Sequence, residues 1–372
     1  MNDPPIVIPK PRGLYNMGNT CYANTTFQCL THCIPLSLFF LKNTFEKHIA
    51  ANAHAEEAAT NKVGDKMNRS QKTAGTPSLL CMKAFFRFLQ EMCMKDTVDH
   101  YSPKELFLLL GKASHCKSNH FESSTTFTIG QQHDMTEFLQ HILDLIHDTV
   151  HFQVKIDIHG KIEGRLDQML TESYNQFATH CGKQYSFVSD MMTGQYFIQN
   201  QTCDNIHPTE HSEKYDPFTI LTLSIPLGRK SCSIYDCLDI MIQPEIIEGW
   251  KGTLTDEERM IEQKTFLWRL PQILMVQLKR FVNRFVKNES TVEIATELNL
   301  SNYCLSRDNQ TAQYNLFAVG NHEGTLQFGH YYADCKNNTG QWNRFNDIHV
   351  SPLQSQQLNG KTAYMLFYYR AS

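Results

Sequence analysis

The chain has 372 residues, 41% of them hydrophobic, and its 34 Lys and Arg nearly balance 38 Asp and Glu, for a formal net charge of −4. This composition predicts one elaborated globular domain or two domains and argues against wholesale disorder. The near-neutral balance, without any run rich in Lys or Arg, argues against nucleic acid as a partner.

No segment near the N-terminus resembles a membrane span or a signal peptide. The longest apolar run near the N-terminus, residues 33–41, is too short to cross a bilayer, and the residues before it do not resemble a signal peptide. The 12 cysteines are scattered along a long chain, which favours free thiols in a reducing compartment. We therefore expect no membrane partner and a cytoplasmic and/or nuclear location.

The first elements in chain order are an arm and a helix. Residues 1–12 hold four prolines and predict an extended N-terminal arm. Apolar residues then recur at helical spacing from Cys21, with Asn19 or Thr20 as the expected cap. Residues 44–78 are polar and have no sustained period, which predicts a surface insertion.

Three more helices are predicted after the insertion. The first two cover residues 78–92 and 102–112, and in the second Ser102 and Glu105 have the spacing of a capping box. The most regular helix covers residues 131–148, and its start carries polar groups. Its expected buried stripe consists of Met135, Phe138, Leu139, Ile142 and Ile146.

From about residue 185 the hydrophobic period becomes that of strands. The predicted strands, rich in β-branched and aromatic residues, cover residues 218–227, 272–282, 314–322, 329–336 and 362–370. Helices first and strands later predict an α+β fold with a largely antiparallel sheet.

Cys21 is the first candidate for chemistry. A helix N-terminus concentrates unpaired amide donors and a positive partial charge, which favour a thiolate. Gly13 and Gly18 permit a tight turn just before the cysteine, and Asn16 supplies an amide donor for an oxyanion. The alternative is an ordinary buried helix thiol, an interpretation that suits Cys29, Cys33, Cys81 and Cys93.

A nucleophilic cysteine needs a base, usually His, and a group that orients the base. Residues 330–345 predict a β-hairpin with its turn at 337–340. If this turn centres on residues 338 and 339, His330 faces Asn346 or Asp347, with Cβ atoms about 4.5–5.5 Å apart. The alternative is an ordinary exposed hairpin, although Gly329 allows close approach of a ligand or backbone.

Four blocks together resemble the ubiquitin-specific protease family of deubiquitinases. Residues 13–30, "GLYNMGNTCYANTTFQCL", are similar to its cysteine box, and residues 322–350, "HEGTLQFGHYYADCKNNTGQWNRFNDIHV", to its histidine box. Residues 131–144, "QQHDMTEFLQHILD", and 270–281, "LPQILMVQLKRF", resemble two intermediate blocks. Because the four occur in the family's order across residues 13–370, the resemblance is specific.

The resemblance implies catalytic roles for five residues. Cys21 would be the nucleophile, His330 the general base, and Asn346 the residue that orients the histidine. Adjacent Asp347 matches a second acidic position, and which of the two dominates stays open. Asn16 would donate to the oxyanion.

The resemblance also implies substrate contacts. Asp134 and Glu137, with Gln132 in the same block, match positions that contact the C-terminal tail of ubiquitin, because carboxylates can hold an arginine-bearing tail. Tyr331 and Gly329 would border a narrow channel for its terminal glycines. The alternative for the two carboxylates is a capped, solvated helix start.

A papain-like α+β fold is implied, with a helical thumb, an antiparallel β palm and β fingers. The catalytic domain would cover residues 13–370, with the thumb at about 13–160, the fingers at about 165–265, and the palm completed by 266–370. Many relatives hold a structural zinc with two Cys-x-x-Cys pairs in the fingers, whereas this sequence has none. From the remaining candidates, Cys181, Cys203, His207 and His211, we predict no zinc and no cofactor.

The sequence thus predicts a cysteine-type deubiquitinase that hydrolyses the bond at the C-terminal glycine of ubiquitin. Its expected partners are ubiquitin and ubiquitinated proteins, and the expected state is a monomer. The alternatives are a catalytically weak ubiquitin-binding module and a protease for another ubiquitin-like modifier. An ordinary papain-type peptidase is disfavoured because Cys21 and His330 lie 309 residues apart, about twice the usual 130–150.

Overall fold

The computed structural model describes residues 11–42, 44–45, 47–49, 77–95, 100–113, 127–182, 184–204, 209–252, 257–282, 286–306, 311–325 and 328–371. Most of the predicted arm and nearly all of the 44–78 insertion lie outside these residues. The chain forms two compact units. Unit 1 comprises Met1–Phe152, Gln184–Val188 and Phe317–Leu366, and unit 2 comprises Gln153–Lys183, Ser189–Leu316 and Phe367–Ser372.

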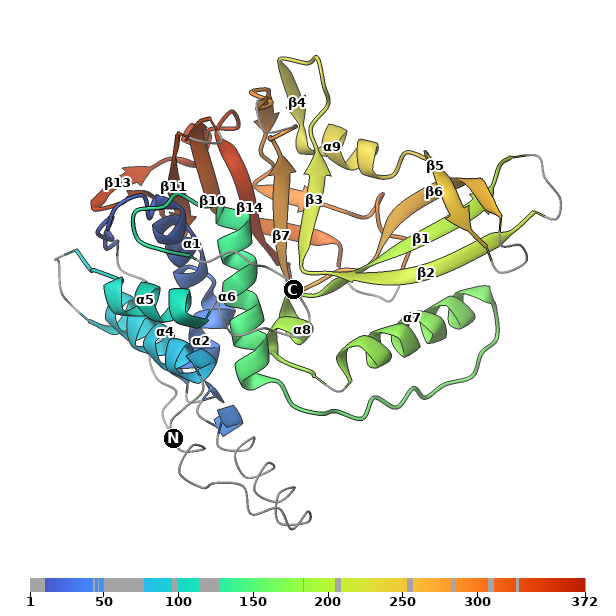
Figure 1. The fold of residues 1–372 in the computed structure, drawn as a ribbon, viewed down its shortest axis with the longest axis horizontal. Coiled ribbons are helices and arrows are strands. Elements are labelled where there is room, and N and C mark those ends of the chain that lie inside the picture. The colour runs from blue at the N-terminus through green and yellow to red at the C-terminus, as the bar shows by residue number, and fades with distance from the viewer. Residues whose placement is uncertain are drawn as a thin grey trace, which may run out of the picture. The chain divides into compact units, whose positions relative to one another are not determined.

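Unit 1 is built around one fully buried helix. Every residue of α1 (Cys21–Thr31) is buried, because the helix packs against other helices on one side and against strands on the other. The surrounding helices are α2 (Ile34–Leu41), α4 (Pro77–Met94), α5 (Lys104–Ala113) and α6 (Met135–Val150) (Figure 1). Rings from four of these segments meet in the core, among them Tyr22, Phe88, Phe107 and Phe138.

The sheet of unit 1 covers the other side of α1. Its strands lie in the order β13-β12-β11-β10-β14, and β10 to β13 pair antiparallel with their neighbours. Their bounds are β10 (Gln313–Gly324), β11 (Gly329–Lys336), β12 (Trp342–Asn346), β13 (His349–Leu353) and β14 (Ala363–Arg370), with a 3₁₀ turn η1 (Ser355–Gln357) before β14. Helix α1 contacts β11 and β12, so the N-terminus of a buried helix lies beside the predicted histidine strand.

Unit 2 contains a helix packed on a four-stranded antiparallel sheet of order β2-β1-β6-β5 (Figure 1). The strands are β1 (Gly194–Thr202), β2 (His211–Phe218), β5 (Glu245–Lys251) and β6 (Glu258–Arg269). The buried rings of Phe197, Tyr215 and Trp268 pack against Met169 and Leu170 of α7 (Arg165–Cys181). This cluster fixes the helix on one face of the sheet.

The rest of unit 2 holds shorter pairings. Strand β3 (Ile220–Ser224) pairs parallel with β7 (Ile273–Lys279), and β4 (Ser231–Ser233) pairs parallel with β8 (Thr291–Glu293). Strand β9 (Glu297–Asn299) pairs with the first residues of β10. Helix α9 (Ile234–Met241) follows β4, and α8 (Phe187–Met191), β10 and β14 each have residues in both units.

Most predicted elements are confirmed. Helices α1, α4, α5 and α6 and strands β3, β7, β10, β11 and β14 lie where their periods placed them, and the whole predicted stripe of α6 is buried. One detail is wrong, because helix α5 begins at Lys104 and Ser102 therefore does not directly precede it. The strand pairings are largely antiparallel, as predicted, with two parallel ones, and helix α7 occupies the start of the stretch expected to be strand-rich.

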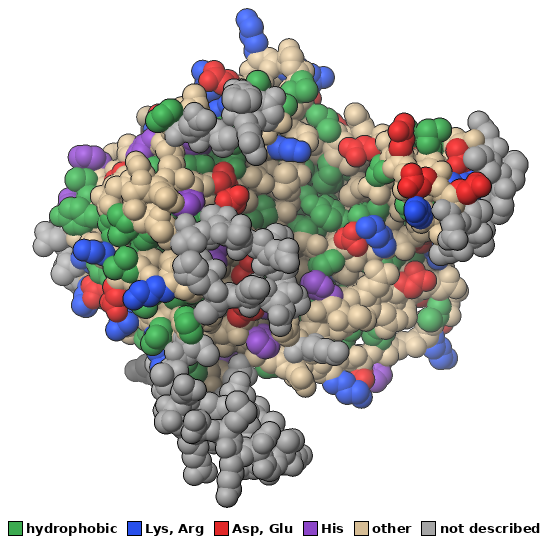
Figure 2. Space-filling model, viewed as in Figure 1, with side chains coloured by type: hydrophobic (Ala, Val, Ile, Leu, Met, Phe, Trp, Pro, Cys, Tyr) green, Lys and Arg blue, Asp and Glu red, His purple; other side chains and the backbone are tan. Residues whose placement is uncertain are grey.

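The hydropathy of the helices and the distribution of charged side chains bear on the partners of the protein. Among the described residues, no helix combines the length and the apolar content needed to cross a membrane. On the face shown in Figure 2, Lys and Arg side chains are interspersed with Asp and Glu rather than gathered in one place. That mixture accords with the near-neutral composition.

Candidate active site

Cys21 occupies the first position of α1, as its spacing predicted. Thr20 precedes it at the N-cap but makes no capping hydrogen bond, because its hydroxyl accepts from the Met17 amide at 2.9 Å. The chain reaches this point through Gly18 (φ 102°) and Asn19 (φ 53°), a left-handed pair that glycine and asparagine tolerate best. With no side-chain cap, the first amides of the helix are available to a negative charge at Cys21.

His330 begins the next part of the site. Its Nε2 lies 2.6 Å from Oδ1 of Asn346. An amide oxygen only accepts hydrogen bonds, so Nε2 must carry the proton and Nδ1 is the ring nitrogen left for the thiol. The hydrogen bond with the Cys21 side chain is the main cause that raises the pKa of His330 to about 9, with Asn346 adding to it and burial opposing it. An imidazolium beside the sulfur is therefore the stable form at neutral pH.

The strand register differs from the predicted one by one residue. Pairs Ala333–Phe345 and Lys336–Trp342 centre the turn on residue 339, so His330 does not directly oppose Asn346 or Asp347. Asn346, the last residue of β12, reaches the histidine diagonally across the two strands. The predicted pair is thus brought together, but by a diagonal contact.

Asp347 has a different function from its neighbour. It adopts φ 52° directly after β12, which turns its carboxylate away from the strand. Oδ1 accepts from the amide of Asn24 at 2.8 Å and Oδ2 accepts from Asn16 at 3.0 Å. Of the two residues that the sequence left open, Asn346 contacts the histidine and Asp347 holds Asn16.

The orientation of the Asn16 amide is fixed from both ends. Its Oδ1 accepts from the backbone amides of Gly18 (3.0 Å) and Thr20 (3.1 Å), so its Nδ2 must face Asp347. An amide nitrogen carries two N–H groups, and one remains for a substrate oxygen. Asn24, buried on α1, was not predicted; its only sequence clue was an amide one helical turn after Cys21.

The Asp134 carboxylate accepts hydrogen bonds from other groups of the protein. It is the N-cap of α6 and accepts from the amides of Thr136 and Glu137. Its other oxygen accepts from the hydroxyls of Tyr364 (2.7 Å) and Tyr331 (3.3 Å). These contacts match the capped helix start that was the alternative interpretation of this residue. The Glu137 side chain is exposed overall. Partial desolvation of its carboxyl group and, second, the nearby charge of Asp134 raise its pKa.

Gly329 and Gln132 meet at the start of the histidine strand. The Gln132 amide donates to the carbonyl oxygen of Gly329 at 2.8 Å. A Cβ at Gly329 would lie 2.1 Å from Nε2 of buried His322, so only glycine fits. The ring of Tyr331 packs on His322 with centroids 4.5 Å apart and is 3% exposed. The structure thus shows these residues as supports of β11, with His322 an unpredicted member.

Near the described ends of β1, β2 and β6, one buried arginine is bonded to two carboxylates. The buried Arg259 of β6 donates to Asp204 at 2.8 and 2.9 Å and lies 3.3 Å from Glu210, so it joins the ends of β1 and β2 to β6. Asp204, which directly follows the exposed Cys203, is thus already bonded to a guanidinium. His207 lies outside the described residues, and no described group of three or more His, Cys, Asp and Glu could hold a metal.

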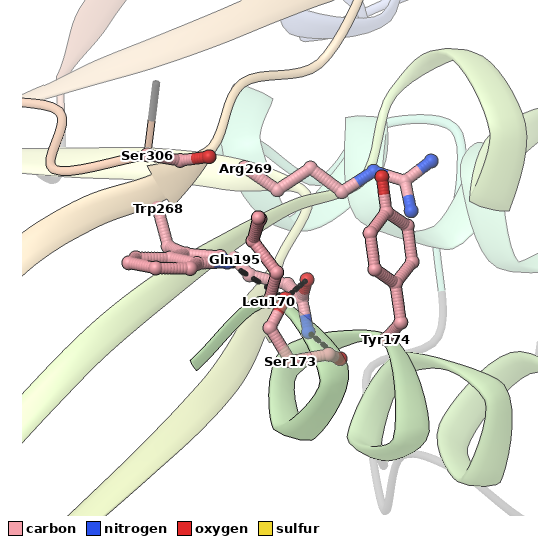
Figure 3. A pocket seen from close by; sticks show the side chains of 7 residues that line it. All are labelled: Leu170, Ser173, Tyr174, Gln195, Trp268, Arg269 and Ser306. Carbon is pink, nitrogen blue, oxygen red and sulfur yellow. Dashed lines mark hydrogen bonds between the residues drawn. The ribbon is translucent and has the colours of Figure 1, made fainter. Parts of the chain in front are cut away.

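A separate small pocket lies between α7 and strands β1 and β6. Its volume is about 50 Å³, and its lining residues are Leu170, Ser173, Tyr174, Gln195, Trp268, Arg269 and Ser306 (Figure 3). Its deepest polar groups bond one another: Trp268 donates to the Ser173 hydroxyl at 2.7 Å, and Gln195 donates to the Ser173 carbonyl at 3.2 Å. None of the predicted site residues lines this pocket.

Comparisons with known proteins agree with the four motifs. A family model described as "Ubiquitin carboxyl-terminal hydrolase" matches residues 12–368. The Drosophila melanogaster protein "Ubiquitin carboxyl-terminal hydrolase Usp2" is 28% identical over 372 residues, which cover 96% of this chain and 34% of that protein. The Homo sapiens protein "Ubiquitin carboxyl-terminal hydrolase 2" is 27% identical over 375 residues, covering 97% and 55%. The chain therefore spans about a third to a half of the length of these relatives.

Solved structures share the fold. "Structure of the SAGA Ubp8/Sgf11/Sus1/Sgf73 DUB module bound to ubiquitin aldehyde" superposes with a TM-score of 0.63 at 23% identity, covering 97% of this chain and 70% of that one. The same module without ubiquitin aldehyde has a TM-score of 0.63 at 22% identity, covering 100% and 70%. These likenesses confirm the predicted papain-like α+β fold.

Proposed function

The chain belongs to the ubiquitin carboxyl-terminal hydrolase family, and on that premise we propose that it is a cysteine-type deubiquitinase. It hydrolyses the isopeptide or peptide bond at the C-terminal glycine of ubiquitin, and its substrates are ubiquitinated proteins. One observation supports this most directly: Cys21 begins a buried helix, its side chain is the main cause that raises the pKa of His330, and Asn346 holds Nε2 of that histidine.

The reaction follows from these contacts. The Cys21 thiolate attacks the carbonyl carbon of the terminal glycine and forms a tetrahedral intermediate. The free N–H of Asn16 and the first amides of α1 stabilise its oxyanion. His330 Nδ1 donates its proton to the leaving lysine amine, and a thioester remains on Cys21. Water then attacks the thioester while His330 takes its proton, which releases ubiquitin and restores the thiolate–imidazolium pair.

The substrate contacts are divided between one exposed and several supporting residues. Glu137 is the carboxylate open to solvent at the start of α6, and we propose that it attracts the basic tail of ubiquitin. Asp134, Gln132, Tyr331 and Gly329 shape the wall beside that tail through the contacts that hold β11 against α6. We further propose that the protein acts as a monomer in the cytoplasm and/or nucleus.

An electrophilic ubiquitin probe tests the activity. Ubiquitin with a C-terminal vinyl sulfone should form a covalent adduct with the wild type and none with Cys21→Ser. Cys29→Ser is the matched control, because this thiol lies in the same helix, is fully buried, and should leave the adduct unchanged. Tight ubiquitin binding without an adduct would indicate a binding module instead. Adducts only with probes built on other ubiquitin-like modifiers would assign a different substrate.

A further inference from the structure

One face of the β11–β12 hairpin carries an ion pair next to the proposed catalytic pair. Asp334 and Arg344 directly oppose each other in the strand register. Arg344 donates from Nε to Oδ1 at 2.7 Å and from Nη2 to Oδ2 at 2.9 Å. This two-pronged geometry fits only a guanidinium and a carboxylate at one relative position, so it specifies the register as well as the pairing.

The ion pair is anchored deep in unit 1. Asp334 has 0% side-chain exposure, and its Oδ2 also accepts from the Asn321 amide of β10 at 3.1 Å. Burial raises the pKa of Asp334, whereas the hydrogen bond to the carboxylate raises the pKa of Arg344. The causes differ because the Arg344 side chain keeps 31% exposure. Loss of the arginine would therefore leave a buried carboxylate with one neutral partner.

Arg344 also contacts Tyr332, which lies between His330 and Asp334 on the same face of β11. Its guanidinium lies over the ring of Tyr332, 4.7 Å from the centroid. Tyr332 is fixed in turn, since its hydroxyl donates to Glu323 at 3.2 Å and lies 3.0 Å from the hydroxyl of Thr362. The planar cation is thus held between a carboxylate and a ring, and it holds β12 to β11.

The pairs Arg344–Tyr332 and Asn346–His330 have the same diagonal offset across the two strands. Arg344 reaches Tyr332 across one diagonal of the ladder, and Asn346 reaches His330 across the next, two residues further along each strand. Alternate residues of a strand share a face, so the ion pair, the stacked ring and the catalytic pair form one row. Any slip of β12 along β11 would displace Asn346 from His330 by the same step.

The burial pattern of the hairpin does not by itself determine this step. Five consecutive residues of β11, Tyr331–Cys335, are buried, and no residue of β12 is exposed, so a slip along the ladder would not move a buried face into solvent. We propose that Arg344 and Asp334 are positioning residues: their ion pair fixes the β11–β12 register and thereby holds the Asn346 amide oxygen on His330 Nε2. The inference rests on the proposed function for the roles of Cys21 and His330.

The test uses a variant that removes the ion pair without leaving a buried charge. Asp334→Asn combined with Arg344→Met should keep a melting temperature near that of the wild type. We expect the kcat for a fluorogenic amide of ubiquitin to fall by up to about tenfold with KM unchanged, because the ion pair acts on His330 through Asn346 and a misplaced group costs no more than its removal. The kcat of Arg344→Lys should lie between those of the wild type and the double variant, since lysine keeps the positive charge but cannot donate two parallel hydrogen bonds to the carboxylate.

A ubiquitin-free readout separates this inference from the proposed function. The rate of Cys21 alkylation by iodoacetamide at pH 7, located by mass spectrometry, depends on the His330 partner and should fall in the double variant. Arg87→Met, which breaks the exposed ion pair of Arg87 with Glu105, is the control and should alkylate like the wild type. If the wild type alkylates rapidly but does not hydrolyse ubiquitin conjugates, only the proposed function fails.

A double-mutant cycle decides whether the ion pair acts through Asn346. In an Asn346→Ala background, the Asp334→Asn and Arg344→Met changes should produce no further loss of alkylation rate. A further loss as large as in the wild-type background would overturn the inference, as would a wild-type alkylation rate in the double variant.

Discussion

Asp347→Ala should lower catalysis by disturbing Asn16 rather than His330. The substitution removes the acceptor at 3.0 Å from the Asn16 amide and at 2.8 Å from the Asn24 amide. A hydrogen bond to a charged group contributes about 1.5–3 kcal/mol, and exposed ones contribute less. Asn24 is buried and Asn16 is exposed, so we expect the free energy of unfolding to fall by about 2–3 kcal/mol.

Asp347→Ala should lower kcat more than Asn346→Ala does. Without Asp347, the Asn16 amide loses the contact that aims its free N–H at the oxyanion, and loss of one such donor lowers kcat about 10²- to 10³-fold. Asn346→Ala removes one hydrogen bond from His330, whose ring keeps its bond to Cys21, so we expect a loss of about tenfold. Asp347→Asn keeps an acceptor oxygen and should fall between wild type and Asp347→Ala.

Steady-state hydrolysis of a fluorogenic ubiquitin amide measures both effects. Asn16→Ala should reproduce the kcat of Asp347→Ala, and the double variant should be no slower than either single variant, because the carboxylate acts through the amide. Losses that multiply in the double variant, or a kcat for Asp347→Ala equal to the wild-type value, would refute this division of roles.

Three further predictions concern β11, the sheet of unit 2 and pH. Gly329→Ala should abolish hydrolysis and lower the melting temperature, because its methyl group would overlap a buried ring, whereas Gly164→Ala, whose Cβ meets nothing within 4 Å, should cost at most about 1 kcal/mol. Arg259→Met should lower the melting temperature by leaving two carboxylates without their cation, while excess EDTA should not change that of the wild type. Because the folded-state pKa of His330 is raised to about 9, the stability that it contributes is complete below about pH 6.5 and is lost as pH rises through about 9. Urea unfolding of wild type and Cys21→Ser should show this loss in the wild type alone, at about 1 kcal/mol after solvent screening of the half-exposed ring.

Local patterns in the sequence were enough to place the elements that carry the site. The helix at Cys21, the stripe of α6 and strand β11 each repeat apolar residues with the period of their structure, and packing preserved that period. Helix α7 was missed although Leu166, Met169, Leu170 and Phe177 recur at helical spacing. Most of its other residues are polar, and Gly164 before it offers no side-chain cap to mark its start.

Contacts between distant segments were harder to predict than the elements themselves. Asp134 offered two interpretations, because a carboxylate before a helix can either cap it or face a ligand. The structure adds contacts that neither interpretation contained, with the hydroxyls of Tyr331 and Tyr364, 197 and 230 residues away. The need for glycine at 329 likewise depends on His322, which pairs with Tyr331 and reaches Gly329 diagonally across the strand pair. Tyr331 and Tyr364 lie outside any window of residues around Asp134, and His322, although near Gly329 in the sequence, meets it only when β10 and β11 pair.

The adjacent residues Asn346 and Asp347 show why the site needs both the strand and its end. A strand of constant twist would place neighbouring side chains on opposite faces, so at most one could serve the histidine. Because β12 stops at Asn346 and Asp347 adopts a left-handed conformation, the Asp347 carboxylate turns toward the loop before Cys21. Asp and Asn tolerate that conformation better than other residues with a side chain. In the proposed mechanism, consecutive residues thus orient the base and support the oxyanion donor, and a change of backbone conformation at 347 would uncouple the two tasks.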